Sequence, residues 1–303
     1  MTVSEKVPGI SLHNGKIVPQ LGFGTLNTQP SREASLANTL LTATIVGQAL
    51  EAGYRHIDTA QSYGTETGVG RAIRESDIRR EDIFITSKLS NTNHAPDDVW
   101  RSFDMTLQNL GLEYVDLFLI HWPLPKVYGD GFVATWKAMT ELLSDGRLRS
   151  AGVSNFQAAH IELIVAETGE IPVVNQIELH PYFTNEATCA VMAGYGIEVE
   201  AHSPLGHNGS PLRDDTLAAI ALAKGKSIAQ VILRWHLQHG RIVIPKSVRP
   251  ERMAENIAIF DFELSPAEVV TIDLLNKGEH GRVGPNPDTF EGIWPLPTSE
   301  ASI

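Results

Sequence analysis

Residues 115–121 read VDLFLIH, a short apolar run that ends in a polar residue and is followed by Trp122 and Pro123. An apolar run of this length, bounded by turn residues, is typical of a strand buried on both faces of a parallel sheet. Similar runs recur along the chain, and segments with helical periodicity lie between them. Alternation of this kind predicts a parallel sheet covered by helices.

The pattern contains eight such strand candidates. We place them at 20–24, 54–59, 83–87, 115–121, 148–153, 173–177, 197–202 and 242–245, with the clearest helices at 96–110, 132–144, 158–167, 185–195 and 228–239. No linker rich in Gly, Ser or Pro divides the chain. The sequence therefore predicts an α/β fold: a single (β/α)8 TIM barrel forming one domain over 1–303.

Two additions to the barrel are expected. Residues 10–18 contain Asn14-Gly15 between apolar positions, which is the strongest short hairpin signal, and this hairpin would cover one end of the barrel. At the other end of the chain, a helix is expected through Asn256 to Ile259, as one of the extra C-terminal helices.

Composition narrows the function classes. The chain is 42% hydrophobic and carries a formal net charge of -12, which argues against nucleic-acid binding. Cys189 is the only cysteine, so we expect a small buried hydrophobe and no disulfide, in keeping with a reducing cytosol. Residues 1–9 lack a signal-peptide pattern and no run is long enough to span a bilayer, so we expect a cytoplasmic protein without membrane contact.

Polar residues end most of the predicted strands. Singly, each is explained as a helix cap or a satisfied partner, but in a barrel all of them meet at one mouth. A buried Asp, Lys and His there would need one another as partners, which favours a functional cluster. The residues are Asp58, Lys88, His121, Ser154, Asn155, Gln176, His202, Ser203, Lys246 and Ser247.

Tyr63 follows Asp58 in the next loop, so its hydroxyl can reach the same mouth, although a surface tyrosine is the simpler interpretation. Its usual pKa of about 10 is too high for proton transfer near neutral pH unless a cation stabilises the phenolate. Lys88 supplies such a cation, held by Asp58, and His121 could donate to a carbonyl oxygen. The set suits delivery of a proton to a carbonyl oxygen.

A phosphate site is predicted after the last strand. Lys246, Arg249 and Arg252 form a basic island beside Pro250, at the start of a helix, which is where barrels often bind phosphate. A solvated basic helix start remains an alternative, for Arg249 in particular. The glycines at 68–70 lie in a helical stretch, where we assign them to packing or a turn.

These motifs resemble the aldo-keto reductase family over about residues 11–288. The matching stretches are GYRHIDTA at 53–60 with Tyr63, TSKL at 86–89, LIHWP at 119–123, GVSNF at 152–156 and IPKS at 244–247. The nearest likeness is to bacterial 2,5-diketo-D-gluconate reductases, which reduce small dicarbonyls, keto sugars and aldehydes.

The resemblance implies site residues and a cofactor. It implies a catalytic tetrad of Asp58, Tyr63, Lys88 and His121, with hydride transfer from NADPH, no metal, and a monomer acting on a small carbonyl compound. It also implies NADP(H) binding: Ser154, Asn155 and Gln176 at the nicotinamide carboxamide, His202 at the position that stacks on the nicotinamide, Lys246, Ser247 and Arg252 at the adenosine 2'-phosphate, and Asn256 at the adenine. Ser203 and Leu205 are implied as further cofactor-binding residues. Phe23, Trp122 and Trp294 are expected to line the substrate pocket.

Three positions depart from the family pattern. His202 stands where relatives place a larger aromatic ring, Ser90 stands where they commonly have Trp, and the segment 28–44 is longer than theirs. A smaller ring offers less stacking area, and Ser90 should widen or polarise the pocket wall.

Two other function classes were weighed. A non-catalytic NADP(H)-binding regulatory subunit would keep the cofactor site without turnover, and the intact tetrad argues against it. A zinc hydrolase using His56, Asp58, His121 and His202 lacks a recognised metal spacing and would leave Lys88 as a repulsive charge.

Overall fold

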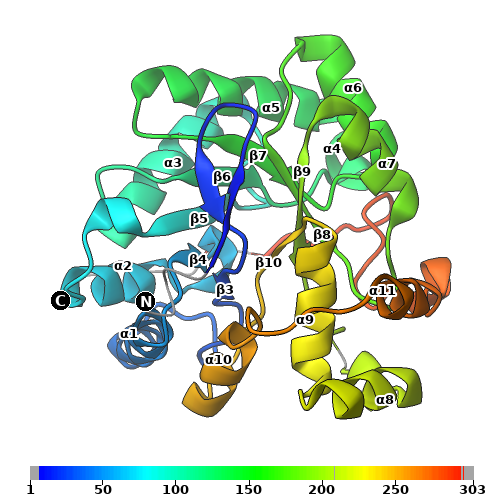
Figure 1. Cartoon of the computed structure of the whole chain (residues 1–303). Helices are drawn as coiled ribbons and strands as arrows, with labels where there is room; N and C mark the ends of the chain where they lie inside the picture. Colours follow the sequence, from blue (N-terminus) through cyan, green and yellow to red (C-terminus); the bar gives the residue numbers. More distant parts are fainter. Residues whose placement is uncertain (1–6, 208, 295, 297–303) are drawn as a thin grey trace.

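The eight parallel strands form one closed sheet in the computed structural model, which describes residues 7–207, 209–294 and 296 (Figure 1). Leu21 forms a parallel bridge with Val243, and the Gly22 N–H donates to the Val243 carbonyl at 2.8 Å, which joins the two edges. The predicted (β/α)8 barrel is confirmed. Its strands, in spatial order, are β10 Ile242–Val243, β9 Glu198–His202, β8 Val174–Glu178, β7 Ala151–Ser154, β6 Leu117–Ile120, β5 Phe84–Leu89, β4 His56–Asp58 and β3 Phe23–Gly24.

Helices surround this sheet (Figure 1). They are α1 Leu36–Glu51, α2 Glu66–Glu75, α3 Pro96–Leu110, α4 Pro125–Tyr128, α5 Phe132–Glu141, α6 Ala158–Thr168, α7 Glu186–Tyr195, α8 Asp215–Lys224, α9 Ile228–Gln238, α10 Pro250–Ile257 and α11 Pro266–Asp273. The predicted helix at 96–110 is found at these bounds because Pro96 opens its first turn and Gly111, at φ 62°, ends it. The predicted 132–144 helix ends at Glu141, and a 3-10 turn continues it to Asp145.

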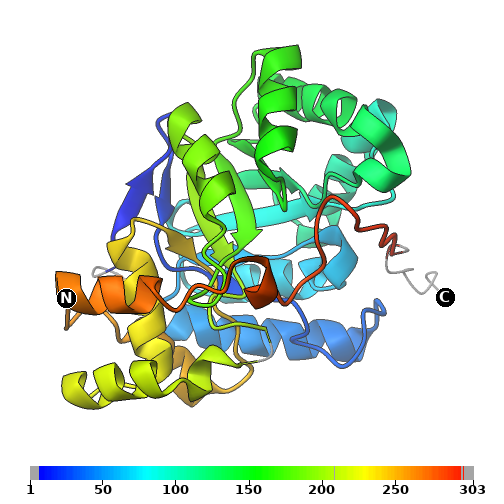
Figure 2. The ribbon, with the colours of Figure 1, turned by 90° about the vertical axis from the view of Figure 1, so that its right-hand side faces the viewer.

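The N-terminal hairpin covers the end of the barrel where the strands begin. β1 Gly9–Ser11 pairs antiparallel with β2 Ile17–Pro19, and Gly15 takes the left-handed conformation that the tight turn requires. Leu12 and Val18 pack on residues near the strand starts such as Phe84. Figure 2 shows this blue hairpin on the left and the red C-terminal segment on the right, so they lie at opposite ends of the barrel. The predicted hairpin is confirmed.

The glycines at 68–70 serve helix packing. A Cβ added to Gly70 would lie 1.8 Å from the Leu110 carbonyl oxygen, and one added to Gly68 would lie 2.5 Å from the Thr42 Cβ. Helix α2 therefore fits between α1 and α3 only where side chains are absent, which confirms the packing interpretation.

No single helix within the described ranges is long and apolar enough to cross a bilayer; α8 and α9 pass the length and composition criteria only together, across a bend of 89°. Much of α9 is buried in the protein, including Val231, Leu233 and Trp235.

Candidate active site

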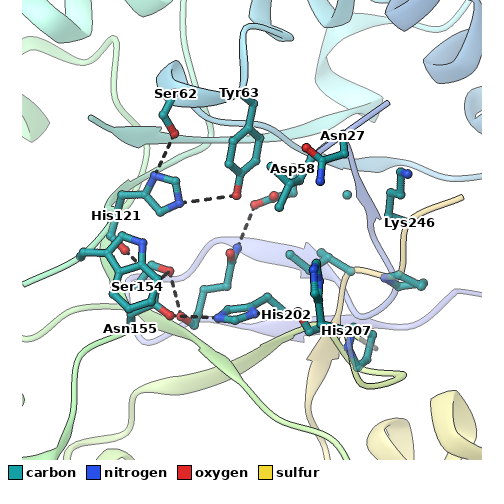
Figure 3. Close-up of a pocket in the computed structure, with 18 of the residues that line it drawn as sticks. Asn27, Asp58, Ser62, Tyr63, His121, Ser154, Asn155, His202, His207 and Lys246 are labelled. Carbon is teal, nitrogen blue, oxygen red and sulfur yellow. Dashed lines mark hydrogen bonds between the residues drawn. The ribbon is translucent and has the colours of Figure 1, made fainter. Parts of the chain in front are cut away.

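A cavity of about 410 Å³ opens where the barrel strands end (Figure 3). Most of the polar residues predicted to meet at this mouth do line it: Asp58, Tyr63, His121, Ser154, Asn155, Gln176, His202, Ser203 and Lys246. Lys88 lies just behind this wall, in contact with Asp58. Strands β4 to β10 and the loops that follow them thus bring together residues as far apart as 58 and 246.

Lys88 and Asp58 form a buried ion pair beneath the cavity. The Lys88 Nζ lies 2.7 Å from both carboxylate oxygens of Asp58 and 2.9 Å from the Thr59 carbonyl oxygen, and its side chain is 0% exposed. Burial alone would lower the pKa of Lys88, but the Asp58 carboxylate outweighs it and raises that pKa. Lys88 therefore stays charged at neutral pH.

Tyr63 is presented by a short 3-10 turn, Gln61–Tyr63, directly after β4. Its hydroxyl oxygen lies 3.5 Å from His121 Nε2 (Figure 3) and 3.4 Å from Lys88 Nζ. Burial raises the pKa of Tyr63, and the Lys88 cation acts in the opposite direction. The hydroxyl is thus protonated at neutral pH and lies beside a charge that favours its phenolate.

His121 is neutral in this setting. Burial and the nearby Lys88 cation hold the pKa of His121 well below its usual range. Its Nδ1 lies 3.5 Å from the Ser62 hydroxyl, so a tautomer with the proton on Nε2 directs an N–H toward Tyr63 and the cavity. A neutral imidazole can donate a hydrogen bond there without repelling Lys88.

Three amide and hydroxyl side chains form one wall. The Asn155 amide donates to the His121 carbonyl at 2.8 Å and to the Ser154 hydroxyl at 3.1 Å, and Ser154 donates to the Gln176 carbonyl at 2.9 Å. Gln176 donates in turn to Asp58 at 2.8 Å. Asn155 has φ 61°, a left-handed conformation that asparagine tolerates better than most residues.

His202 continues this wall. Its Nε2 lies 2.9 Å from the Asn155 side-chain oxygen and its Nδ1 lies 3.2 Å from the Ser203 hydroxyl. Burial lowers the pKa of His202 to about 4, although Glu178 acts against this shift. The ring is therefore neutral, donates from Nε2 to Asn155, and is held in one orientation.

The basic island lies at the far end of the same groove. Lys246 is exposed and lines the cavity beside Leu205 and Gly206, while Ser247 is buried and its hydroxyl accepts from the Arg249 N–H at 3.1 Å. Arg252, on the first turns of α10, is exposed, and Asn256 is buried on the same helix. Lys246 and Arg252 form no ion pair with any described residue, and the backbone there turns into a helix start, an arrangement of free cations and N–H groups that is able to bind a phosphate.

Aromatic side chains form the outer side of the cavity. Trp122 and Trp294 line it, and Phe290 packs between them. The centroid of the Phe290 ring lies 4.2 Å from that of Trp122 and 5.4 Å from that of Trp294. The Asn91 amide donates to the Gly292 carbonyl at 2.7 Å and so fixes the C-terminal segment over the mouth.

Two expected features of the pocket are placed elsewhere. Phe23 does not line the cavity: side chains alternate along a strand, so its ring points outward and packs edge-on against Tyr54 at 5.4 Å, while Gly24 faces the cavity. The interpretation of Phe23 as a substrate residue is therefore corrected. Ser90 is fully buried, with its N–H donating to Gln61 at 2.7 Å, and it also lies outside the lining residues.

Sequence reasoning missed several cavity residues. Asn27, Arg32 and His207 line the mouth from loops that carry no regular periodicity, and only their nearness to strand ends signals them. Beneath the cavity, Glu200 points into the barrel with its Oε1 3.8 Å from His56 Nε2. Burial, with Asp58 nearby, raises the pKa of Glu200 to about 8, so it is largely protonated at neutral pH.

The C-terminal segment is anchored by Glu178 at the end of β8. The carboxylate accepts from the backbone N–H groups of Val283 at 2.7 Å and Gly284 at 2.8 Å, and from His180 at 3.1 Å. Burial raises the pKa of Glu178, but these donors outweigh it and lower the value to about 2. Gln157 adds a second anchor through Asp288 at 2.9 Å.

Within the parts of the chain that the structure describes, no group of three or more His, Cys, Asp or Glu side chains is arranged to hold a metal ion.

Comparison with known proteins places the chain in a family. The model of the Aldo/keto reductase family matches residues 20–277. The chain is 44% identical to the glyoxal reductase of Bacillus subtilis, over 92% of this chain and 96% of that protein, and 42% identical to the methylglyoxal reductase DkgA of Escherichia coli K12, over 93% and 98%.

Solved structures agree with this match. An aspartate-to-alanine mutant of Gox0644 in complex with NADPH superposes with a TM-score of 0.86 at 40% identity, covering 94% of this chain and 99% of that one. A Bombyx mori aldo-keto reductase in complex with NADP gives a TM-score of 0.81 at 38% identity, covering 91% and 95%. The chain belongs to the aldo/keto reductase family, whose members are NADP(H)-dependent oxidoreductases acting on carbonyl compounds.

Proposed function

We propose that this protein uses NADPH to reduce small aldehydes, dicarbonyls or keto sugars to alcohols, with Tyr63 as the proton donor. The observation that carries the proposal is the position of the Tyr63 hydroxyl, 3.4 Å from Lys88 Nζ and 3.5 Å from His121 Nε2 at the inner end of the cavity. The relatives named as glyoxal and methylglyoxal reductases support the substrate range.

The substrate oxygen is oriented by two donors. A carbonyl oxygen placed between the Tyr63 hydroxyl and His121 Nε2 accepts a hydrogen bond from each, which polarises the carbonyl and stabilises the negative charge that develops on that oxygen. Tyr63 then passes its proton to the oxygen. The Lys88 cation stabilises the phenolate that remains, and Asp58 keeps Lys88 charged and in place.

The cofactor supplies the hydride when it is bound. Ser154, Asn155 and Gln176 are expected to hold its carboxamide, with His202 and the nearby Ser203 and Leu205 beside the nicotinamide. Lys246, Ser247, Arg252 and Asn256 are expected to hold the adenosine phosphate end. The hydrogen bonds that join Asn155 to His202 and His121 support this assignment, because they fix the orientation of the wall in advance.

We propose further that the protein is a monomer with a single domain over 1–303; the single domain is supported by the eight barrel strands, which all belong to one sheet. In this arrangement Trp122 and Trp294 cover the substrate, and their apolar faces exclude water from the reacting carbonyl.

The test follows NADPH consumption with methylglyoxal, an aromatic aldehyde and 2,5-diketogluconate. We expect turnover by the wild type to fall roughly 10²- to 10⁴-fold in Tyr63→Phe, because the ring stays and only the proton donor is lost. Tyr195→Phe, on the exposed side of α7, is the matched control and should keep full activity. Tight NADPH binding without turnover of any carbonyl would refute the proposal and favour a regulatory cofactor-binding subunit.

A further inference from the structure

Arg32 lies at the mouth of the cavity, in the segment between β3 and α1. This segment belongs to the longer 28–44 stretch of the sequence, and the Arg32 side chain is among the residues that line the cavity. Its guanidinium carbon lies 5.1 Å from the ring centroid of Trp294, which lines the same cavity from the C-terminal segment. Arg32 and Trp294 therefore border one entrance.

The backbone around Arg32 is fixed against the turn that carries Tyr63. The Gln29 amide donates to the carbonyl oxygens of Tyr63 and Gly64, both at 3.3 Å. Gly64 has φ 72°, and a Cβ added to it would lie 2.5 Å from the Arg32 carbonyl oxygen. The chain at Arg32 thus lies directly on the backbone that follows the proposed proton donor.

The other side of the segment is fixed to α1. The Asn38 amide donates to the Glu33 carbonyl at 2.9 Å and to the Ser31 hydroxyl at 3.1 Å, and the Thr42 hydroxyl donates to Gln29 at 2.9 Å. Because both flanks of Arg32 are held by side chains of structured elements, its backbone position is defined although its side chain is exposed.

The guanidinium has no carboxylate partner. Among residues 7–207, 209–294 and 296, no Asp or Glu oxygen lies within 4.0 Å of it. Its charge acts at the inner end of the cavity: it opposes the rise that burial causes in the pKa of Tyr63, and it adds to the lowering of the pKa of His121 by burial and Lys88.

The charge balance of the cavity is opposite to that of the chain. Among the described residues that line the cavity, Asp58 is the only carboxylate, and Lys88 pairs with it at 2.7 Å. Arg32 and Lys246 are the lining cations, and Lys246 lies at the cofactor-phosphate end. A chain with net charge -12 therefore presents a positive entrance where the substrate enters.

We propose that Arg32 is a specificity residue that selects oxo acids, carbonyl compounds that also carry a carboxylate. A guanidinium forms paired hydrogen bonds with a carboxylate, so Arg32 binds the acid group at the mouth while the carbonyl group lies at Tyr63 and His121. This inference rests on the proposed function and adds the substrate class.

The test compares 4-carboxybenzaldehyde with its methyl ester, which has the same ring and aldehyde without the charge. We expect the ratio of kcat/KM for the acid to that for the ester to fall roughly tenfold in Arg32→Gln, mainly through a higher KM for the acid. Arg32→Lys keeps the charge but cannot form paired hydrogen bonds, so its ratio should lie between those of the wild type and Arg32→Gln. Arg101→Gln, on the exposed part of α3, makes the same change in net charge and should leave the ratio at the wild-type value.

The outcomes separate the two proposals. A wild type that reduces the ester in a Tyr63-dependent manner, with an acid-to-ester ratio that Arg32→Gln leaves unchanged, would overturn the role of Arg32 and keep the proposed function. A wild type that reduces neither compound nor any other aldehyde would overturn both. A ratio that falls equally in Arg32→Gln and Arg101→Gln would show a general charge effect and also overturn the specific site.

Discussion

Removal of one partner of the Lys88–Asp58 pair should destabilise the protein strongly. In Lys88→Met, the Asp58 carboxylate stays 2% exposed and keeps only the Gln176 amide as a side-chain donor. Leaving a buried charge without its partner costs about 3–5 kcal/mol of unfolding free energy. We expect a loss of this size at neutral pH, measured by urea unfolding followed by tryptophan fluorescence.

A charge-neutral double variant separates stability from catalysis. Asp58→Asn combined with Lys88→Met leaves no buried charge at this point, so we expect it to recover at least half of the stability lost in the single variant. Both variants should lose turnover by roughly a hundredfold or more, because the cation that favours the Tyr63 phenolate is absent from both.

The pH dependence gives a further check. In Lys88→Met the buried Asp58 has a pKa above its unfolded value of 3.8, so its penalty is present at neutral pH and disappears as the pH falls toward that value. The reasoning is refuted if the single variant loses less than about 1 kcal/mol, or if the double variant is no more stable than the single one.

Three other perturbations have defined outcomes. Glu178→Gln should lower the unfolding free energy by roughly 3 kcal/mol above about pH 5. The difference from wild type should vanish as the pH falls from 4.5, the usual pKa of a glutamate, through the folded pKa of about 2. Thermal melts across this pH range measure the difference. Gly70→Ala should lower the unfolding free energy by about 1–3 kcal/mol, because the added Cβ would lie 1.8 Å from the Leu110 carbonyl oxygen. Gly47→Ala in α1 has open space at the Cβ and should raise the unfolding free energy by about 0.5–1 kcal/mol. Equal effects of the two variants in urea unfolding would contradict the packing argument. Lys246→Met should raise the KM for NADPH about tenfold and leave the KM for NADH nearly unchanged, and a similar rise for both cofactors would exclude a contact with the 2'-phosphate.

The regular parts of the fold were predictable because they depend on local patterns. Short apolar runs located all eight strands, and the strand ends located the lysine and aspartate that the structure pairs. The rule that strand ends meet at one mouth of a barrel then assembled the site without any distance information.

The remainder depends on tertiary contacts that leave no periodic trace. Arg32 reaches the cavity because Gln29 and Asn38 fix its loop, and neither contact follows from sequence spacing. Phe23 was misplaced because the predicted strand at 20–24 reads QLGFG, in which glycines flank Phe23 and no alternation of polar and apolar residues marks the inward face. Residues 283–294 form no helix, and their course over the mouth follows from the anchor at Glu178.

Because Glu178 holds the C-terminal segment through backbone N–H groups, the attachment does not depend on the side chains of the outer cavity wall. The segment 285–294 carries Phe290 and Trp294, touches the barrel at few hydrogen-bonded points, and lies beyond α11, the last α-helix of the described residues. A grafted segment of different composition that keeps the backbone N–H groups facing Glu178 would inherit the same attachment. Substrate preference can in this way be exchanged by engineering one contiguous stretch near the C-terminus, while the proton-transfer residues stay on the barrel strands and in the loop after β4.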